Sequence, residues 1–94
     1  MLQVQQLVGD VWRVSVIAAT HTEHQVRVTS ADVQRFSGGR GNAAQLLEAS
    51  FRFLLEREPN TSILREFELP VISRYFPEYE REIGRYLAKS STEH

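Results

Sequence analysis

A chain of 94 residues, 41% of them hydrophobic, can form one domain with a hydrophobic core over residues 1–94 but is too short for two. It has no cysteine, which excludes disulfide bonds, thiolate catalysis and cysteine-ligated zinc. The net charge of −1 argues against partners attracted mainly by charge, such as bulk DNA or an anionic membrane. No apolar run approaches the ~20 residues of a membrane span, and the first residues lack a signal-peptide pattern, so we expect a cytoplasmic location.

The N-terminal third of the chain has the pattern of three strands. Residues 2–8, 11–20 and 24–29 alternate apolar and polar side chains, as half-buried strands do. Gly9 and Asp10 fit a two-residue hairpin turn between the first two strands, because glycine readily adopts a positive φ. These signals predict a three-stranded antiparallel meander with one covered face.

A long helix is predicted at residues 42–58, NAAQLLEASFRFLLERE. Its apolar side chains, with Phe51 among them, cover more than half of the helix circumference when residues are placed 100° apart. We therefore expect this helix to be covered from two directions, by the sheet and by further helices. Asn42 can cap its first turn with Gln45 reaching back, and Pro59 prevents its continuation.

Four shorter helices complete a fold predicted to be α+β, at residues 31–37, 62–67, 70–76 and 77–88. In the last of them Tyr79, Ile83, Tyr86 and Leu87 recur at helical spacing, which predicts a stripe that faces the core. Gly84 inside the same helix costs ~1 kcal/mol relative to alanine. We therefore expect another part of the chain to approach it closely.

The first candidate site is the loop Gly38-Gly39-Arg40-Gly41 between two predicted helices. The spacing G-x-x-G-x-x-A-x-x-L that ends at Leu47 resembles the GxxG loop of KH domains, which clamps a nucleic-acid backbone. Glycines let the backbone approach phosphate, the next helix offers free N–H groups, and Arg40 adds positive charge. KH domains also complete their sheet with a strand after these helices, whereas the rest of this chain has a helical pattern. A structural turn is therefore favoured over nucleic acid as a partner.

A metal site is the second possibility, at His21-Thr22-Glu23-His24. In a turn that runs into a strand, His21 and Glu23 share a side while His24 faces away, and the only other histidine is His94. Zinc needs side chains that converge on one point and further ligands from elsewhere in the chain. The sequence therefore predicts a polar turn, with no metal and no cofactor.

Acid–base chemistry is the third possibility, because Glu56, Glu58, Glu66 and Glu68 lie close together in the sequence. Paired carboxylates in a cleft can act as general acid and base. These carboxylates alternate with arginines, however, and no histidine or hydroxyl nucleophile lies beside them. A solvated, ion-paired face is the favoured interpretation, and a small-ligand enzyme remains the third functional hypothesis.

The fourth candidate is a surface for protein partners in the C-terminal half, where aromatic residues and arginines are mixed. This composition is typical of interfaces, and the open edges of a small sheet also invite pairing. The expected interface residues are Tyr75, Phe76, Tyr79, Tyr86, Arg74 and Arg81. The favoured hypothesis is a non-enzymatic protein-interaction domain, with a homodimer as one expected assembly, and nucleic-acid binding at the glycine loop is the alternative.

Two blocks in the C-terminal half carry a family resemblance. EASFRFLLEREP at 48–59 and PVISRYFPEYEREI at 70–83 resemble segments of small bacterial proteins that have no assigned function. The resemblance implies a free-standing bacterial protein of the cytoplasm and points to no particular activity.

Overall fold

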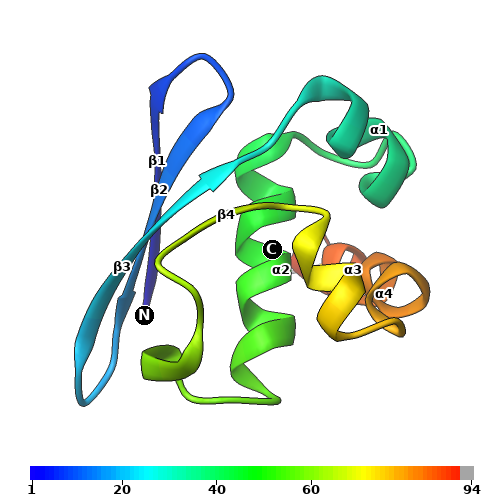
Figure 1. The fold of residues 1–94 in the computed structure, drawn as a ribbon. Coiled ribbons are helices and arrows are strands. Elements are labelled where there is room, and N and C mark those ends of the chain that lie inside the picture. The colour runs from blue at the N-terminus through cyan, green and yellow to red at the C-terminus, as the bar shows by residue number, and fades with distance from the viewer. Residues whose placement is uncertain (92–94) are drawn as a thin grey trace.

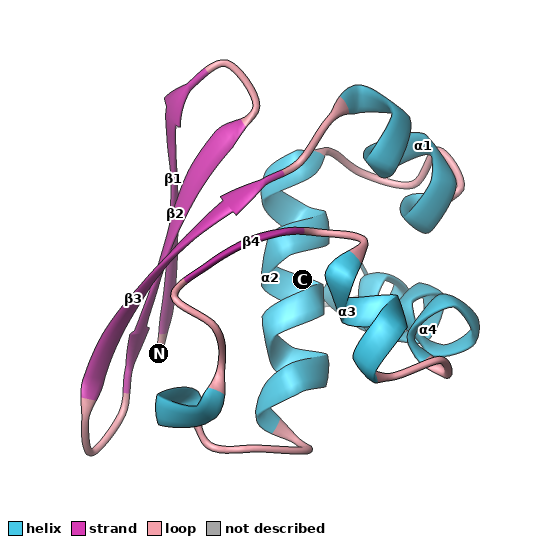
Figure 2. Cartoon of the chain, in the orientation of Figure 1, coloured by secondary structure: helices cyan, strands magenta, loops and turns pink. Residues whose placement is uncertain are grey.

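The computed structural model describes residues 1–91 and has a four-stranded sheet with its helices gathered on one face (Figures 1 and 2). The predicted α+β class is confirmed. In chain order the elements are β1 (Leu2–Val8), β2 (Val11–Ile17), β3 (His21–Arg27), α1 (Ser30–Ser37), α2 (Ala43–Leu55), the 3₁₀ helix η1 (Asn60–Ser62), β4 (Glu66–Glu68), α3 (Val71–Tyr75) and α4 (Tyr79–Ser91). No helix within residues 1–91 combines the length and the apolar character needed to cross a membrane.

The first three strands form the expected antiparallel meander, in the order β1-β2-β3. Gly9 has a φ of +56° in the tight turn between β1 and β2, where a side chain would be strained. Val14, Val16 and Val26 are buried beneath the helices, because alternate residues of a strand face the same side of the sheet. The strand boundaries differ slightly from the prediction, since β2 ends at Ile17 and β3 already begins at His21.

The helix predicted at 62–67 is wrong, because this segment contains the end of η1 and the strand β4. β4 pairs with β3 in parallel, so the sheet order is β1-β2-β3-β4. The N–H of Gln25 donates to the carbonyl of Arg65 at 2.7 Å, and the N–H of Leu69 donates to that of Arg27 at 3.0 Å. The open edge of β3 thus supplies backbone hydrogen-bond partners for β4. A helix as short as the one predicted at 62–67 has little stability of its own, so the strand pairing is favoured over it.

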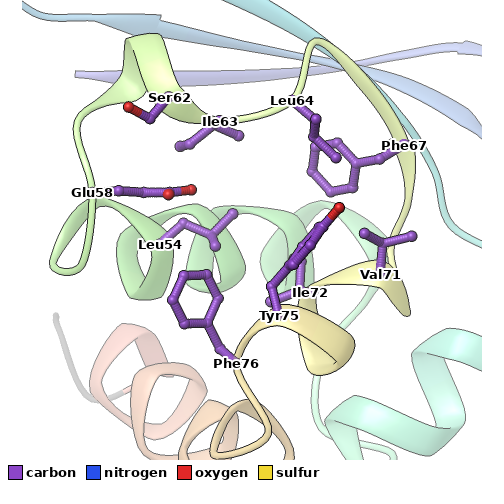
Figure 3. Close-up of a pocket in the computed structure, with 10 residues that line it drawn as sticks. All are labelled: Leu54, Glu58, Ser62, Ile63, Leu64, Phe67, Val71, Ile72, Tyr75 and Phe76. Carbon is purple, nitrogen blue, oxygen red and sulfur yellow. The ribbon is translucent and has the colours of Figure 1, made fainter.

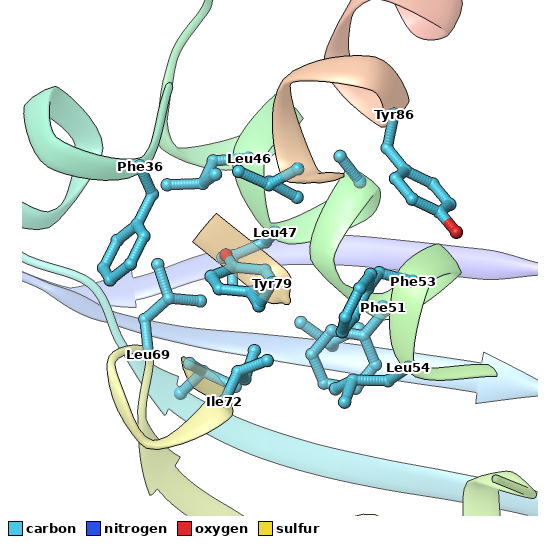
Figure 4. Packing of buried hydrophobic residues seen from close by; sticks show 14 of the residues in the cluster. Phe36, Leu46, Leu47, Phe51, Phe53, Leu54, Leu69, Ile72, Tyr79 and Tyr86 are labelled. Atoms are coloured by element: carbon cyan, nitrogen blue, oxygen red, sulfur yellow. The ribbon is translucent and has the colours of Figure 1, made fainter. Parts of the chain in front are cut away.

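Helix α2 lies between the sheet and the other helices, as predicted (Figure 1). Phe51 is fully buried on the side of the sheet, with its ring centroid 5.3 Å from that of His24 in β3. Phe53, also fully buried, contacts the α4 rings of Tyr79 and Tyr86, at 5.3 and 5.7 Å (Figure 4). The two phenylalanines therefore join the helix to both layers of the core.

The two ends of α2 follow local sequence signals. The side chain of Asn42 accepts the N–H of Gln45 at 2.9 Å, and the side chain of Gln45 accepts the N–H of Asn42 at 3.0 Å. This capping box satisfies two N–H groups that the first helical turn leaves unpaired, and it confirms the predicted start. The helix ends at Leu55, before the expected position 58, and the chain then turns ahead of Pro59.

The core-facing stripe predicted for the last helix is confirmed, since Tyr79, Ile83, Tyr86 and Leu87 are all buried. The expected close approach at Gly84 is not found: a Cβ atom built there would meet nothing within 4 Å. This glycine therefore lowers the stability of α4 without allowing closer packing in the part of the chain that the structure describes.

Candidate functional site

An open apolar groove of about 340 Å³ lies beside α3 (Figure 3). Its walls come from the C-terminal end of α2, the segment from η1 to β4, and α3. The residues that line it are Leu54, Glu58, Ser62, Ile63, Leu64, Phe67, Val71, Ile72, Tyr75 and Phe76. Leu64 and Tyr75 remain 47% and 66% exposed at its mouth, whereas Ile63 and Ile72 are buried beneath.

The groove arises because the chain reverses direction twice around the end of α2. Pro59 leads the chain out of α2 in an extended conformation, and η1 starts the return towards the sheet. After β4, Pro70 at φ −60° directs the chain into α3. The three walls thus come from segments that are joined by proline-containing turns and meet only in the folded chain.

A buried polar network fixes the wall that carries Leu64. The ring of His24, only 1% exposed, lies with Nδ1 2.7 Å from the carbonyl oxygen of Leu64 and Nε2 2.9 Å from the hydroxyl of Thr22. The amide of Asn60 donates to the carbonyl of Thr20 at 2.7 Å and to the hydroxyl of Thr22 at 3.0 Å. These bonds tie the segment after α2 to the start of β3.

The protonation state of His24 follows from its partners. A carbonyl oxygen only accepts hydrogen bonds, so Nδ1 must carry the proton that it shares with Leu64. Burial in the core lowers the pKa of His24 below its usual 6.5 and favours the neutral ring, whose Nε2 then accepts from the hydroxyl of Thr22. The groove wall is therefore held by a neutral imidazole.

Glu58 supplies the charged group of the groove. The residue is half-buried, and its side chain lies along the wall formed by the end of α2 (Figure 3). Within residues 1–91 it has neither a side-chain hydrogen bond nor an ion pair. Most of the other lining groups are aliphatic or aromatic, so the site combines apolar walls with one unpaired negative charge.

The structure divides the predicted interface residues into two groups. Tyr75 and Phe76 line the groove, and Arg74 and Arg81 are exposed nearby in the sequence. Tyr79 and Tyr86 are not available to a partner, because they are only 0% and 8% exposed and pack against Phe53. Their place in the core follows from the helical stripe that the same residues form in α4.

The two buried tyrosines also use their hydroxyl groups within the core. The hydroxyl of Tyr79 lies 2.6 Å from that of Ser50, and burial raises its pKa well above the usual 10.0. The hydroxyl of Tyr86 donates to the carboxylate of Glu56 at 2.6 Å. Both polar groups are satisfied, as buried polar groups normally are, and neither is presented to a partner.

Leu64 and Phe67 are groove residues that the proposed interface did not include. A sequence signal exists for Phe67, because Phe67 and Leu69 alternate with Glu66 and Glu68 after the end of α2. The prediction of a helix at 62–67 places these side chains 100° apart and so hides the face that they share in a strand. Pairing of β4 with β3 places Phe67 on the helix-covered side, where it contacts Phe51 with a ring separation of 6.2 Å.

The glycine loop 38–41 lies at the opposite end of α2 from the groove. Three glycines take positive φ values of +62°, +84° and +80°, so the loop depends on glycine. The N–H groups of Gly39 and Arg40 both donate to Ser37, to its hydroxyl at 3.2 Å and to its carbonyl at 3.1 Å. The N–H of Gly38 donates to the carbonyl of Gln34 at 3.1 Å, so three of the four loop amides are occupied within the chain, while the Arg40 side chain is exposed.

The possible metal ligands do not converge in the described residues, and the candidate acids divide between Glu58 in the groove and Glu66 with Glu68 on one face of β4. His21 and Glu23 lie 3.7 Å apart on the exposed face of β3, and His24 points into the core on the other face. Glu66 accepts a hydrogen bond from Gln25 at the sheet edge. Within residues 1–91 there is no group of three or more histidine, aspartate or glutamate side chains placed to hold a metal ion.

Comparison with protein-family models, curated proteins and solved structures finds no match to this chain. The functional interpretation therefore rests on the geometry of the groove, the loop and the sheet.

Proposed function

We propose that this chain is a non-enzymatic protein-interaction domain, and that its groove binds an apolar side chain of a protein partner. The observation that carries the proposal is the pair of exposed apolar side chains, Leu64 and Tyr75, at the mouth of an apolar groove of about 340 Å³. An exposed apolar patch around a hollow is typical of a binding surface. The volume suits one large aromatic or aliphatic anchor.

The negative charge of Glu58 in the groove indicates which charge a partner should carry. Glu58 is a half-buried residue whose carboxylate has no ion-pair partner within the described residues, so an acidic partner would add an unfavourable like charge. A lysine or arginine beside the anchor would instead give Glu58 an opposite charge. The proposed ligand is therefore a peptide segment with a bulky apolar residue next to a basic one.

Two capped dipeptides test this proposal, acetyl-Trp-Lys-amide and acetyl-Trp-Glu-amide, titrated into isotope-labelled protein and followed by NMR. Burial of one aromatic anchor should give a dissociation constant on the order of 1 mM for the lysine peptide. We expect saturable shifts around Leu64, Phe67 and Tyr75, and weaker binding of the glutamate peptide. Absence of saturation, or shifts confined to other surfaces, would contradict the proposal.

Three variants separate the two features of the site. Tyr75→Ser should weaken both peptides, and Glu58→Gln should remove the preference for lysine over glutamate. Val8→Ser is the matched control, because Val8 is an apolar residue at least as exposed as Tyr75, at 73% against 66%, and does not line the groove. It should change neither affinity.

A specific observation also favours the nucleic-acid alternative as a second candidate. Strand β4 follows α1, the glycine loop and α2 and pairs with β3, so a strand does complete the sheet after these helices. We infer that β4 corresponds to the strand with which KH domains complete their sheet after these helices. The sequence pattern does not predict this strand. The exposed Arg40 would then contact phosphate, although Arg35 is occupied by an ion pair with Glu80 at 2.8 Å.

Anisotropy of labelled single-stranded RNA and DNA, measured over a range of salt, tests this second candidate. If Arg40 contacts phosphate, Arg40→Ala should weaken binding and lower the slope of log affinity against log salt by about 1. Arg74→Ala, an exposed arginine next to the groove, is the control and should leave the slope unchanged. Equal effects of the two variants would argue against a phosphate contact at the loop.

A further inference from the structure

The two edges of the sheet differ in how well they resist pairing with another strand. β4 is three residues long, carries Glu66 and Glu68, and is followed closely by Pro70, and all three features discourage strand addition. β1 has seven residues, LQVQQLV, with no charge and no proline. Among the described residues, β1 is therefore the less protected edge, and its one irregularity is a bulge between Gln6 and Val8, next to the turn.

The direction of the free backbone groups of β1 follows from its register with β2. The backbone groups of Met1 and Ile17 exchange two hydrogen bonds, at 2.9 and 2.8 Å. Hydrogen-bonded and non-bonded pairs alternate along an antiparallel ladder. The register therefore turns the N–H and C=O groups of Leu2, Val4 and Gln6 away from β2, towards the open edge.

The side chains of β1 are arranged almost symmetrically about Val4. On the open face of the sheet, Gln3 and Gln5 lie on either side of Val4, with the exposed Met1 before them and the exposed Leu7, in the bulge between Gln6 and Val8, after them. An antiparallel second copy centred on Val4 would therefore place Gln3 opposite Gln5, so that amide meets amide on both sides of the axis, and would bring Met1 towards the bulge that contains Leu7.

The exposed apolar side chains gather at the same edge. Of the six large hydrophobic residues that are exposed in the described chain, Leu64 and Tyr75 belong to the groove. The remaining four lie on β1 or beside it: Met1, Leu7, Val8 and Ile17. An apolar, uncharged edge with outward backbone groups matches the features that promote pairing between chains.

We propose that two copies of this chain associate by antiparallel pairing of their β1 strands around a two-fold axis through Val4. The sheet then continues from one copy into the other, and the outward groups of Leu2, Val4 and Gln6 find backbone partners in the second copy. The contact is isologous, as two-fold homodimer contacts are. It is independent of the groove, which lies beside the other edge of the sheet.

Sedimentation of the full chain from low micromolar to millimolar concentration tests this assembly, and two double variants test its register. Gln3→Glu with Gln5→Glu places like charges opposite each other across the two-fold axis. Gln3→Lys with Gln5→Glu places opposite charges there. Both variants carry glutamate at position 5 opposite Arg13 of the same chain, so they differ only at position 3.

The wild type should change from the mass of one chain to that of two as its concentration rises. The glutamate pair should weaken association about tenfold or more, and the lysine–glutamate pair should preserve or strengthen it. Thermal melting of the variants checks that both remain folded, as expected for exposed side chains. A wild type that keeps the mass of one chain throughout, or equal loss of association in the two variants, would overturn the proposal.

Discussion

The Nδ1 atom of His24 lies 2.7 Å from the carbonyl oxygen of Leu64, 40 residues further along the chain. This bond joins β3 to a wall of the groove, and it does so through a group that can gain a proton near neutral pH. Protonation would leave a buried positive charge and would oblige Nε2 to donate to Thr22 instead of accepting from it. The stability of the fold, and of this wall, should therefore depend on pH.

The free energy of unfolding should fall as the pH decreases below about 6.5. Burial lowers the pKa of His24 in the folded chain, so between this lowered pKa and 6.5 the unfolded chain binds more protons. Stability is thus complete above 6.5 and is lost at no more than about 1.4 kcal/mol per pH unit below it. Urea unfolding at several pH values measures the slope.

Two histidine variants identify the group responsible. His24→Gln lowers stability through lost packing and hydrogen bonds but removes the titrating group, so it should abolish this part of the slope. His21→Gln replaces an exposed imidazole on the same strand and should retain the wild-type slope. If the variant at position 24 kept the full pH dependence, another group would have to be its source.

Phe51→Ala should lower the free energy of unfolding by about 3–5 kcal/mol, because it opens a cavity between α2 and the sheet. The ring is 0% exposed and lies against His24 and Phe67. Thermal or urea unfolding provides the measurement. A change below ~1 kcal/mol would mean that the helix does not occupy the centre of the core.

Parts of this architecture were predictable because their causes are local in sequence. The capping box of Asn42 and Gln45 and the apolar stripe around Phe51 need only neighbouring residues to form. β4 needs the edge of β3 as a partner, so the segment 62–67 carries too little local information to identify a strand. The groove depends on β4 and is therefore not predicted as a site, although Tyr75, one of the residues that line it, belongs to the predicted interface.

The predicted interface contains two residues that the structure places in the core. The same residues, Tyr79 and Tyr86, fit both a core stripe and an aromatic interaction surface. Their spacing in α4 decides between these roles, since the structure buries both against Phe53. Tyr75 lies in the short helix α3, which has no such stripe to bury it, and it remains exposed.

Arg57→Ala should lower the free energy of unfolding by about 1–2 kcal/mol. The guanidinium lies 3.6 Å from the ring centroid of Phe53 and pairs with Glu78 and Glu82, each at 3.1 Å. It therefore joins the end of α2 to the start of α4 while remaining only 21% exposed. Arg57→Lys should recover part of the loss, because lysine retains the charge but not the fork of donors.

Arg85→Ala is the matched control for this ion-pair cluster. Arg85 pairs with the same oxygen of Glu82 at 3.1 Å but is 73% exposed. Exposed ion pairs contribute little, so the expected change stays below about 0.5 kcal/mol. Equal losses for the two arginines in urea unfolding would show that burial over Phe53 adds nothing.

Gly84→Ala should raise the free energy of unfolding by about 0.5–1 kcal/mol, because alanine loses less backbone entropy than glycine within a helix. A Cβ atom at this position of α4 meets nothing within 4 Å, so the gain is not offset by a clash. Gly41→Ala is the contrasting substitution. Gly41 has a φ of +80°, and a Cβ atom there would clash with Oε1 of Gln45.

The clash at position 41 falls on the side chain that completes the capping box of α2, so Gly41→Ala combines backbone strain with a damaged cap. Together these effects should lower stability by about 1–3 kcal/mol. The two variants make the same chemical change, glycine to alanine, but we expect the free energy of unfolding to rise for Gly84→Ala and to fall for Gly41→Ala. Urea unfolding of both variants measures the two changes. If both substitutions changed the free energy of unfolding in the same direction, then either the free space at Gly84 or the capping arrangement beside Gly41 would be wrong.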